Sequence, residues 1–201
     1  NIGIPKGRSI VHDAITSSKT IFISLDIETG GEYCGILQLS CKISQIEIAQ
    51  KGNSSTQDRA SSIKREEDTF NKYVNPGEGA IWSDSATNIH GLTSNGIRIS
   101  GAGGIAIVWR QFEDWVDSNL WNDEVGILVA YNGETCDHKW LWRLTQAPNS
   151  PYNMPPKIQF YIDPLHRIKN FKGCKLHPSK SKLESLELGC IWKYIRGANL
   201  L

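Results

Sequence analysis

The sequence predicts an α/β layer fold with a mixed sheet. Three features favour it: runs rich in β-branched residues, helical periodicity elsewhere, and an order in which adjacent strands precede alternating helices and strands. With 201 residues, of which 39% are hydrophobic and 21% charged, the chain is long enough for one domain with a substantial core. Its apolar runs are shorter than the roughly 20 residues that a membrane span needs, and its composition is not that of a disordered chain.

Strands are expected where β-branched and apolar side chains run together or alternate between turn residues. In chain order these segments are residues 20–25, 36–48, 70–74, 125–131 and 158–162. The first reads TIFISL, which predicts a strand buried on both faces, whereas the second alternates imperfectly and predicts one or two antiparallel strands. Residues 50–68, rich in Ser, Lys and Glu, predict a mobile polar loop.

Helices are expected where apolar residues recur every three to four positions or where a capping residue begins a segment. In chain order these are residues 85–89, 105–120 and 138–145, a segment starting at residue 164, and residues 181–191. Ser83 or Asp84 would cap the first helix. The second is clearest, because apolar residues from Ile105 to Val116 share one face. Asp163 would cap the fourth helix, which has Pro at its first position.

Charge is distributed unevenly along the chain. The net charge of +1 excludes binding to nucleic acid by bulk charge alone. Residues 157–201 hold nine basic and three acidic side chains, which fits an ordinary solvated face as well as a phosphate contact. The chain has five cysteines, a number too small and odd for a secreted protein stabilised by disulfides. We therefore expect reduced thiols and an intracellular protein, in the nucleus or cytoplasm, that is not secreted. The chain begins with Asn1 and has no signal peptide, so we expect a piece of a longer polypeptide.

Asp26 and Glu28 are the most informative pair in the sequence. Side chains two apart on a strand point the same way, and two carboxylates on one side of a buried strand cost on the order of several kcal/mol unless a cation or hydrogen-bond donors neutralise them. At the C-terminal end of a strand they face the crevice where α/β sheets bind ligands. Such oxygen ligands suit Mg²⁺ or Mn²⁺ rather than Zn²⁺. The alternative is a turn in which Asp26 caps the following backbone.

Asp137 is a third candidate ligand. It follows the strand expected at residues 125–131 and starts a helix, where it could simply be the N-cap. If the first and fourth strands are neighbours, however, Asp26, Glu28 and Asp137 converge at one edge of the sheet. Two cations about 3.5–4 Å apart in such a site can clamp the attacking and leaving oxygens of a phosphodiester. If the strands are neighbours, the pattern therefore indicates a site in which all three carboxylates could hold two cations.

Five segments in this order resemble the motifs of the DEDDh-type 3′→5′ exonucleases of the ribonuclease H-like superfamily. They are ISLDIETG at residues 23–30, VNPG and NIHGLT within 73–93, VAYNGETCDHKWL at 129–141, YIDPL at 161–165 and KLESLELGC at 182–190. The resemblance covers roughly residues 20–201, and the five-residue step from Asn132 to Asp137 is similar to that of the three-prime repair exonuclease (TREX) branch. Endonucleases and transposase-type domains of the same superfamily space their acidic residues differently.

The resemblance implies a three-layer ribonuclease H-like fold, with a mixed five-stranded sheet flanked by helices, and removal of nucleotides from 3′ ends with two Mg²⁺ or Mn²⁺ ions. Asp26, Glu28 and Asp137 would be the metal-binding and catalytic carboxylates. Residues implied to contact the terminal nucleotide are Thr29, Gly30, Ile89, His90, Leu92, Tyr131 and Asn132. The implied substrate is the 3′ end of single-stranded or frayed nucleic acid, DNA more than RNA. No membrane partner is expected; a homodimer and attachment to a larger polypeptide both stay open.

The sequence departs from the family pattern in three places. Tyr131 stands where many relatives have His, and Cys136 replaces the usual aromatic residue. The third motif, a His followed five residues later by Asp, is absent after the helix expected at residues 181–191. We therefore expect an N-terminal extension at residues 1–19 and an exonuclease domain at 20–201 that stops before its last motif. Loss of the general base removes about 10²–10⁴-fold in rate, so this chain is expected to be impaired. The alternative is a catalytically inactive exonuclease-fold module that binds nucleic acid or serves as a scaffold.

Overall fold

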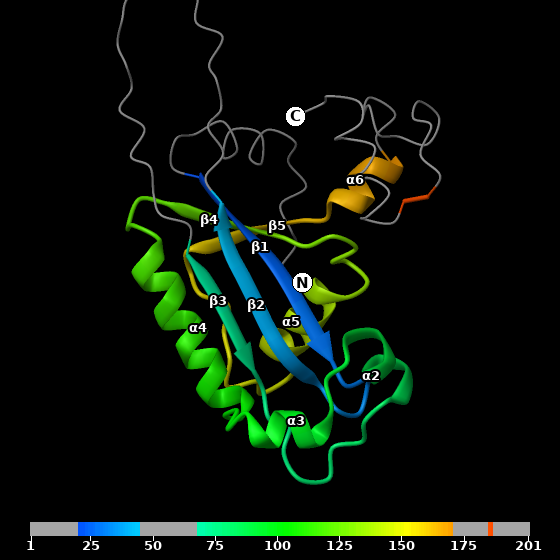
Figure 1. Cartoon of the computed structure of the whole chain (residues 1–201). Coiled ribbons are helices and arrows are strands. Elements are labelled where there is room, and N and C mark those ends of the chain that lie inside the picture. The colour runs from blue at the N-terminus through cyan, green and yellow to red at the C-terminus, as the bar shows by residue number, and fades with distance from the viewer. Residues whose placement is uncertain (1–19, 45–67, 171–184, 187–201) are drawn as a thin grey trace, which may run out of the picture.

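A computed structural model describes residues 20–44, 68–170 and 185–186 of the chain, and Figure 1 shows the arrangement of its elements. The strands are β1 (Thr20–Thr29), β2 (Ile36–Ser44), β3 (Thr69–Tyr73), β4 (Val125–Val129) and β5 (Ile158–Ile162). The helices are α2 (Asp84–His90), α3 (Ser94–Ile99), α4 (Ile105–Asn119), α5 (Asp137–Gln146) and α6 (Pro164–Asn170). The expected extension at residues 1–19 lies outside the described residues, as do nearly all of the expected loop at 50–68 and helix at 181–191.

The five strands form one mixed sheet in the order β3-β2-β1-β4-β5. Strands β1, β2 and β3 pair antiparallel, whereas β4 pairs parallel with both β1 and β5. The expected mixed five-stranded sheet with flanking helices is therefore confirmed. The parallel pairing of β1 with β4 runs from Thr20 opposite Val125 to Ser24 opposite Val129. It places the C-terminal ends of both strands at one edge of the sheet, as the convergence of Asp26 and Asp137 requires.

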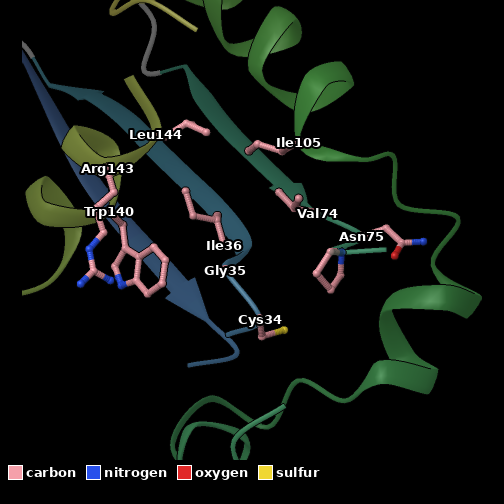
Figure 2. A pocket seen from close by; sticks show the side chains of 10 residues that line it. Cys34, Gly35, Ile36, Val74, Asn75, Ile105, Trp140, Arg143 and Leu144 are labelled. Atoms are coloured by element: carbon pink, nitrogen blue, oxygen red, sulfur yellow. The ribbon is translucent and has the colours of Figure 1, made fainter. Parts of the chain in front are cut away.

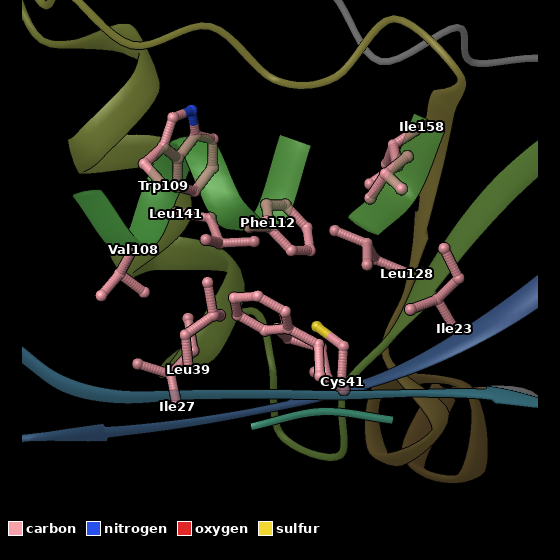
Figure 3. Packing of buried hydrophobic residues seen from close by; sticks show 14 of the residues in the cluster. Ile23, Ile27, Leu39, Cys41, Val108, Trp109, Phe112, Leu128, Leu141 and Ile158 are labelled. Carbon is pink, nitrogen blue, oxygen red and sulfur yellow. The ribbon is translucent and has the colours of Figure 1, made fainter. Parts of the chain in front are cut away.

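The main core lies between the sheet and helices α4 and α5. Figure 3 shows Trp109 and Phe112 of α4 and Leu141 of α5 packed against residues of β1 and β2. These three side chains are almost completely buried, as are Ile23 and Leu39 on the facing strands. Such burial of large apolar side chains is the main source of stability of the fold and holds the sheet in place as a rigid support.

Strand β1 contributes alternate residues to this core, and the expectation that it is buried on both faces is wrong. Ile21, Ile23, Leu25 and Ile27 are buried, whereas Ser24 and Asp26 between them are exposed. The strand also continues to Thr29, four residues beyond the expected end at residue 25. Asp26 and Glu28 therefore lie within a strand whose apolar residues anchor it from the opposite face.

Side chains cap helices α2, α3 and α6, whereas α4 and α5 begin without a side-chain capping bond. Ser83 caps α2, which decides between the two expected caps, and the Asp163 carboxylate accepts from the Leu165 amide in the first turn of α6, at 2.9 Å. Helix α3 was not expected, because its sequence SNGIRI has no apolar periodicity; its signal is Thr93, whose Oγ1 accepts from Gly96 N at 3.1 Å. In the part of the chain that the structure describes, no helix has the length and apolar character to cross a membrane.

Candidate active site

Asp26 and Glu28 project from the polar face of β1, opposite to the main core. Across the antiparallel pair they face Ser40 and Gln38 of β2, respectively. Asp26 is exposed and Glu28 is half-buried. The alternative role for Asp26, that of a capping residue in a turn, is wrong because Asp26 is paired in the middle of the β1–β2 ladder.

Asp137 reaches the same stretch of β1 from the side. The parallel pairing of β1 with β4 ends at Ser24, so the amide of Ile27 lies beyond the last paired residue of β4. One carboxylate oxygen of Asp137, Oδ1, accepts a hydrogen bond from that amide at 2.7 Å. The side chain of Asp137 is buried, with 6% of the residue exposed. The third carboxylate is therefore held against the backbone between Asp26 and Glu28.

Asp137 is not the N-cap of helix α5, contrary to the alternative that the sequence left open. The capping position belongs to Cys136, which makes no side-chain capping bond, and Asp137 is the first residue of the helix. Its carboxylate is directed to a different element, strand β1. The neighbouring His138 lies elsewhere: its ring packs edge-on against Tyr161 of β5, with 5.2 Å between the ring centroids.

The three carboxylates interact electrostatically. Burial raises the pKa of Glu28 and the nearby charge of Asp26 raises it further, although His90 opposes this shift. Burial also raises the pKa of Asp137; its hydrogen bonds with the backbone, including that from Ile27, oppose the shift, and the charges of Asp26 and Glu28 add to it. Like charges close together disfavour ionisation of each. A divalent cation between them would reverse this effect, because it favours the charged forms.

The donor set fits a hard divalent cation. Within residues 20–44, 68–170 and 185–186, no three His, Cys, Asp or Glu side chains are gathered into a ready-made metal cage. Mg²⁺ does not need such a cage, since it usually keeps several waters and takes only one or two carboxylates together with substrate phosphates. Asp26, Glu28 and Asp137 offer oxygen donors alone, and their mutual repulsion is what a cation would relieve.

Helix α2 is fastened to the end of β1 near these carboxylates. His90 bonds through Nε2 to the carbonyl of Thr29 at 3.1 Å, and its Nδ1 accepts from the Leu92 amide at 2.9 Å. Because an amide can only donate, Nδ1 is the unprotonated nitrogen and Nε2–H donates to Thr29. Ile89, beside it, is 84% exposed. The stretch implied to surround the terminal nucleotide therefore presents an apolar side chain on a fixed support.

Gly30 occupies a position where the packing leaves no room for a side chain. A Cβ atom there would lie 2.3 Å from Sγ of Cys34. Its amide donates to the Gly35 carbonyl at 3.0 Å, and its carbonyl accepts from the Ser83 amide at 2.8 Å. The backbone groups of Gly30 are thus engaged within the protein, which ties the turn after β1 to the start of α2.

Tyr131 and Asn132 follow β4 at the same edge of the sheet. The Tyr131 hydroxyl donates to the carbonyl of Leu186, and Asn132 adopts a left-handed backbone conformation with φ of 61°. The amide of Asn132 donates to Oδ1 of Asp163 at 3.0 Å. The sequence assigned Asp163 only to the cap of α6, so its bond to this loop was missed; YIDPL, similar to the family's strand-end motif, was the available signal.

A cavity of about 290 Å³ lies elsewhere, between α5 and the adjoining ends of β2 and β3 (Figure 2). It is lined by Cys34, Gly35, Ile36, Val74, Asn75, Pro76, Ile105, Trp140, Arg143 and Leu144. The lining contains none of the residues that the sequence predicted for the site. The three carboxylates therefore do not line this cavity.

Neither a scan against protein-family models nor a search of curated proteins finds a match for this chain. Solved structures of similar fold are found. Cell-death related nuclease 4 (CRN-4) aligns with a TM-score of 0.56 and 16% identity over 91% of this chain and 57% of its own. The nuclease domain of 3′hExo, a DEDDh family member bound to rAMP, aligns with a TM-score of 0.52 and 16% identity over 79% of this chain and 73% of its own.

Exonuclease I, in complex with the inhibitor BCBP, aligns with a TM-score of 0.50 and 14% identity over 75% of this chain and 29% of its own. This chain therefore spans 57% of cell-death related nuclease 4 and less than a third of exonuclease I. At such low identities the likeness is one of fold. The chain shares the fold of these nucleases, among them 3′hExo, which is described as a DEDDh family member.

Proposed function

We propose that this chain is a 3′→5′ exonuclease domain that acts on nucleic-acid ends with divalent metal ions, Mg²⁺ or Mn²⁺. The observation that carries the proposal is the hydrogen bond from Ile27 N to Asp137 Oδ1, because it brings a carboxylate from α5 to the backbone between Asp26 and Glu28. A bond between two buried groups 110 residues apart in sequence fixes this proximity. The fold shared with known nucleases adds independent support.

In this proposal Asp26, Glu28 and Asp137 hold the metal ions, which would activate the attacking water and stabilise the leaving oxygen. The terminal nucleotide would lie beside them, against α2. The exposed Ile89 offers an apolar contact for the base of that nucleotide. His90 holds α2 against the end of β1 through its hydrogen bond with the carbonyl of Thr29. Asn132 is exposed and Tyr131 half-buried in the loop that follows β4, where they would contact the sugar or phosphate.

The proposal extends to rate and substrate. We place the domain at residues 20–201 and expect this chain to act slowly, because no His with an Asp five residues later follows the expected last helix and loss of a general base costs about 10²–10⁴-fold. The step from Asn132 to Asp137 favours DNA, single-stranded or frayed. Among the similar structures, 3′hExo is described as bound to rAMP, so RNA belongs in the same assay.

The test is a time course with single-stranded DNA and RNA of one sequence, labelled at the 5′ end, in Mn²⁺ and in EDTA. We expect a ladder that shortens from the 3′ end only in Mn²⁺ and is lost in Asp26→Asn. Glu134→Gln is the matched control, because Glu134 is an exposed carboxylate at the same sheet edge that pairs with His166 at 2.9 Å. Cleavage that also occurs in circular single strands, or that survives in Asp26→Asn, would contradict the proposal.

A catalytically inactive module that binds nucleic acid is the second candidate. One observation favours it: the described residues hold no three metal-binding side chains already gathered at one point. The two candidates differ in metal dependence. A binding module would retain nucleic acid equally well in EDTA and in Mn²⁺, and Asp26→Asn, which removes a negative charge, would strengthen binding slightly.

A further inference from the structure

The carboxylate of Asp163 binds two different elements at once. Its Oδ1 accepts from the amides of Leu165 and His166 at 2.9 and 3.4 Å, which is the ordinary N-cap of helix α6. The same oxygen accepts from the amide of Asn132 at 3.0 Å, and Oδ2 accepts from the amide of Glu134 at 3.2 Å. A helix cap explains only the first pair of bonds. The second pair joins the end of β5 to the loop that follows β4.

The loop that follows β4 directs the amides of Asn132 and Glu134 away from its own carbonyl groups, so these amides need an acceptor outside the loop. Inside it, the amide of Gly133 donates to Ala130 O at 3.1 Å and the amide of Cys136 donates to Asn132 O at 3.2 Å. The left-handed conformation of Asn132, with φ of 61°, turns the chain between them. Neighbouring amides that point to one side of such a turn form a concave site for an anion, and the Asp163 carboxylate receives two of them.

The loop leads directly into Asp137. The amide of His138 donates to Gly133 O at 2.8 Å, so the first turn of α5 is hydrogen-bonded to the same loop. Asp137 in turn accepts from the amide of Ile27. Hydrogen bonds and the covalent backbone together thus link Asp163, through the loop, to Asp137, whose carboxylate lies between Asp26 and Glu28.

We propose that Asp163 is a positioning residue: by holding the amides of Asn132 and Glu134 it fixes the place of Asp137 against β1. The proposal rests on the proposed function for its catalytic meaning, since a displaced Asp137 would no longer share a cation with Asp26. Its structural content, the coupling of Asp163 to the Ile27 amide, stands on the geometry alone. Outer groups that orient metal ligands typically change metal affinity or activity by about 10–100-fold when removed.

Asp163→Ser is the variant that separates the two roles of this residue. Ser is among the preferred N-cap residues, so the cap of α6 is kept. Its hydroxyl is one bond shorter than a carboxylate and offers a single oxygen, so it cannot serve both loop amides as well. Asp163→Asn is a milder second variant, because an amide keeps one acceptor oxygen and loses the other.

The matched control is Lys157→Met, which acts at the other end of the same strand. Lys157 Nζ donates to the carbonyls of Leu120 and Asp117, at 2.7 and 3.1 Å, at the C-terminal end of α4. Its loss also removes hydrogen bonds, here between the residue that precedes β5 and the end of α4. It should therefore lower stability while leaving the loop before Asp137 untouched.

The experiment measures hydrogen exchange of the Ile27 amide by NMR, together with Mn²⁺ affinity by titration, in the whole chain and its variants. In Asp163→Ser we expect the Ile27 amide to exchange about tenfold faster than in wild type, as loss of a hydrogen bond to a charged group implies, and Mn²⁺ to bind at least about tenfold more weakly. In Asp163→Asn the increase in the exchange rate of the Ile27 amide should be smaller. In Lys157→Met the exchange rate of this amide should increase no more than the rates of the other sheet amides.

An Ile27 amide that stays as well protected in Asp163→Ser as in Lys157→Met would overturn the inference, whatever the stability of the two variants. If Asp163→Ser does not fold, wild-type protection of Ile27 in Asp163→Asn has the same meaning. Failure of the proposed function gives a different result: wild type and Asp26→Asn would then bind Mn²⁺ equally weakly, while exchange at Ile27 still reports on Asp163.

Discussion

Asp137 has two opposite effects on the stability of the metal-free protein, and two substitutions separate them. Its carboxylate satisfies a backbone amide at a buried position, with Ile27 N 2.7 Å from Oδ1. It also adds a negative charge beside Asp26 and Glu28. Asp137→Ala removes both effects. Asp137→Asn removes the charge but retains an oxygen that can accept from Ile27.

The expected magnitudes follow from these contacts. In EDTA, Asp137→Ala leaves the Ile27 amide without its acceptor, which costs about 1–3 kcal/mol for a buried donor. Asp137→Asn keeps the bond and relieves the repulsion among the carboxylates, so its stability should lie within about 1 kcal/mol of wild type or above it. The difference between the variants, about 2 kcal/mol, measures the hydrogen bond.

Urea unfolding followed by fluorescence of the seven tryptophans provides the assay. The same titration in Mn²⁺ at about 100 times the dissociation constant should stabilise wild type by about 2.7 kcal/mol, and both variants by much less. Equal losses in the two variants in EDTA would refute the hydrogen-bond role. Equal stabilisation of all three proteins by Mn²⁺ would refute the metal-binding role of Asp137.

Three further predictions concern other parts of the structure. Gly30→Ala should lower the free energy of unfolding by about 1–3 kcal/mol, measured by urea titration, because its Cβ would lie 2.3 Å from Sγ of Cys34. Lys157→Met should lower the thermal midpoint by an amount equivalent to about 1 kcal/mol, measured by calorimetry, without changing Mn²⁺ affinity. Burial and the neighbouring charges raise the pKa of Asp137 in the folded chain, so its protonated form stabilises the fold at low pH and this contribution is lost as pH rises through the raised pKa. Unfolding in EDTA across this range should therefore show Asp137→Asn gaining stability relative to wild type as pH rises; a constant difference would contradict the shift.

The strands and their order along the chain could be predicted from local patterns, but the convergence of β1 and β4 rested on an assumption. TIFISL and the run that becomes β4 were recognisable as strands, and only their adjacency had to be assumed. The alternating burial of β1 could not be predicted from residues 20–25, because Ser24 is the only polar residue between Ile21 and Leu25, and one polar residue is too few to reveal alternation. The additional helix α3 was missed for a similar reason, since polar residues dominate it and its cap at Thr93 is the only signal.

The contacts that build the site could not be predicted, because they depend on where elements end in space. The parallel pairing of β1 with β4 ends at Ser24, so β4 offers no acceptor to the amide of Ile27. That amide is therefore available to the side chain of Asp137. Asp163 was recognised as a helix cap from the Pro164 that follows it. Its bonds to Asn132 and Glu134 arise only when β5 pairs beside β4 and brings both strand ends together.

The most direct test that these carboxylates bind metal is the location of Mn²⁺ by anomalous scattering in crystals soaked with the ion. We expect density at the C-terminal end of β1, with oxygens of Asp26 and Asp137 as ligands at about 2.0–2.2 Å and Glu28 adjacent. With a bound mononucleotide, we expect a second ion about 3.5–4 Å from the first. Crystals that contain saturating Mn²⁺ but show no ion between Asp26 and Asp137 would contradict this expectation.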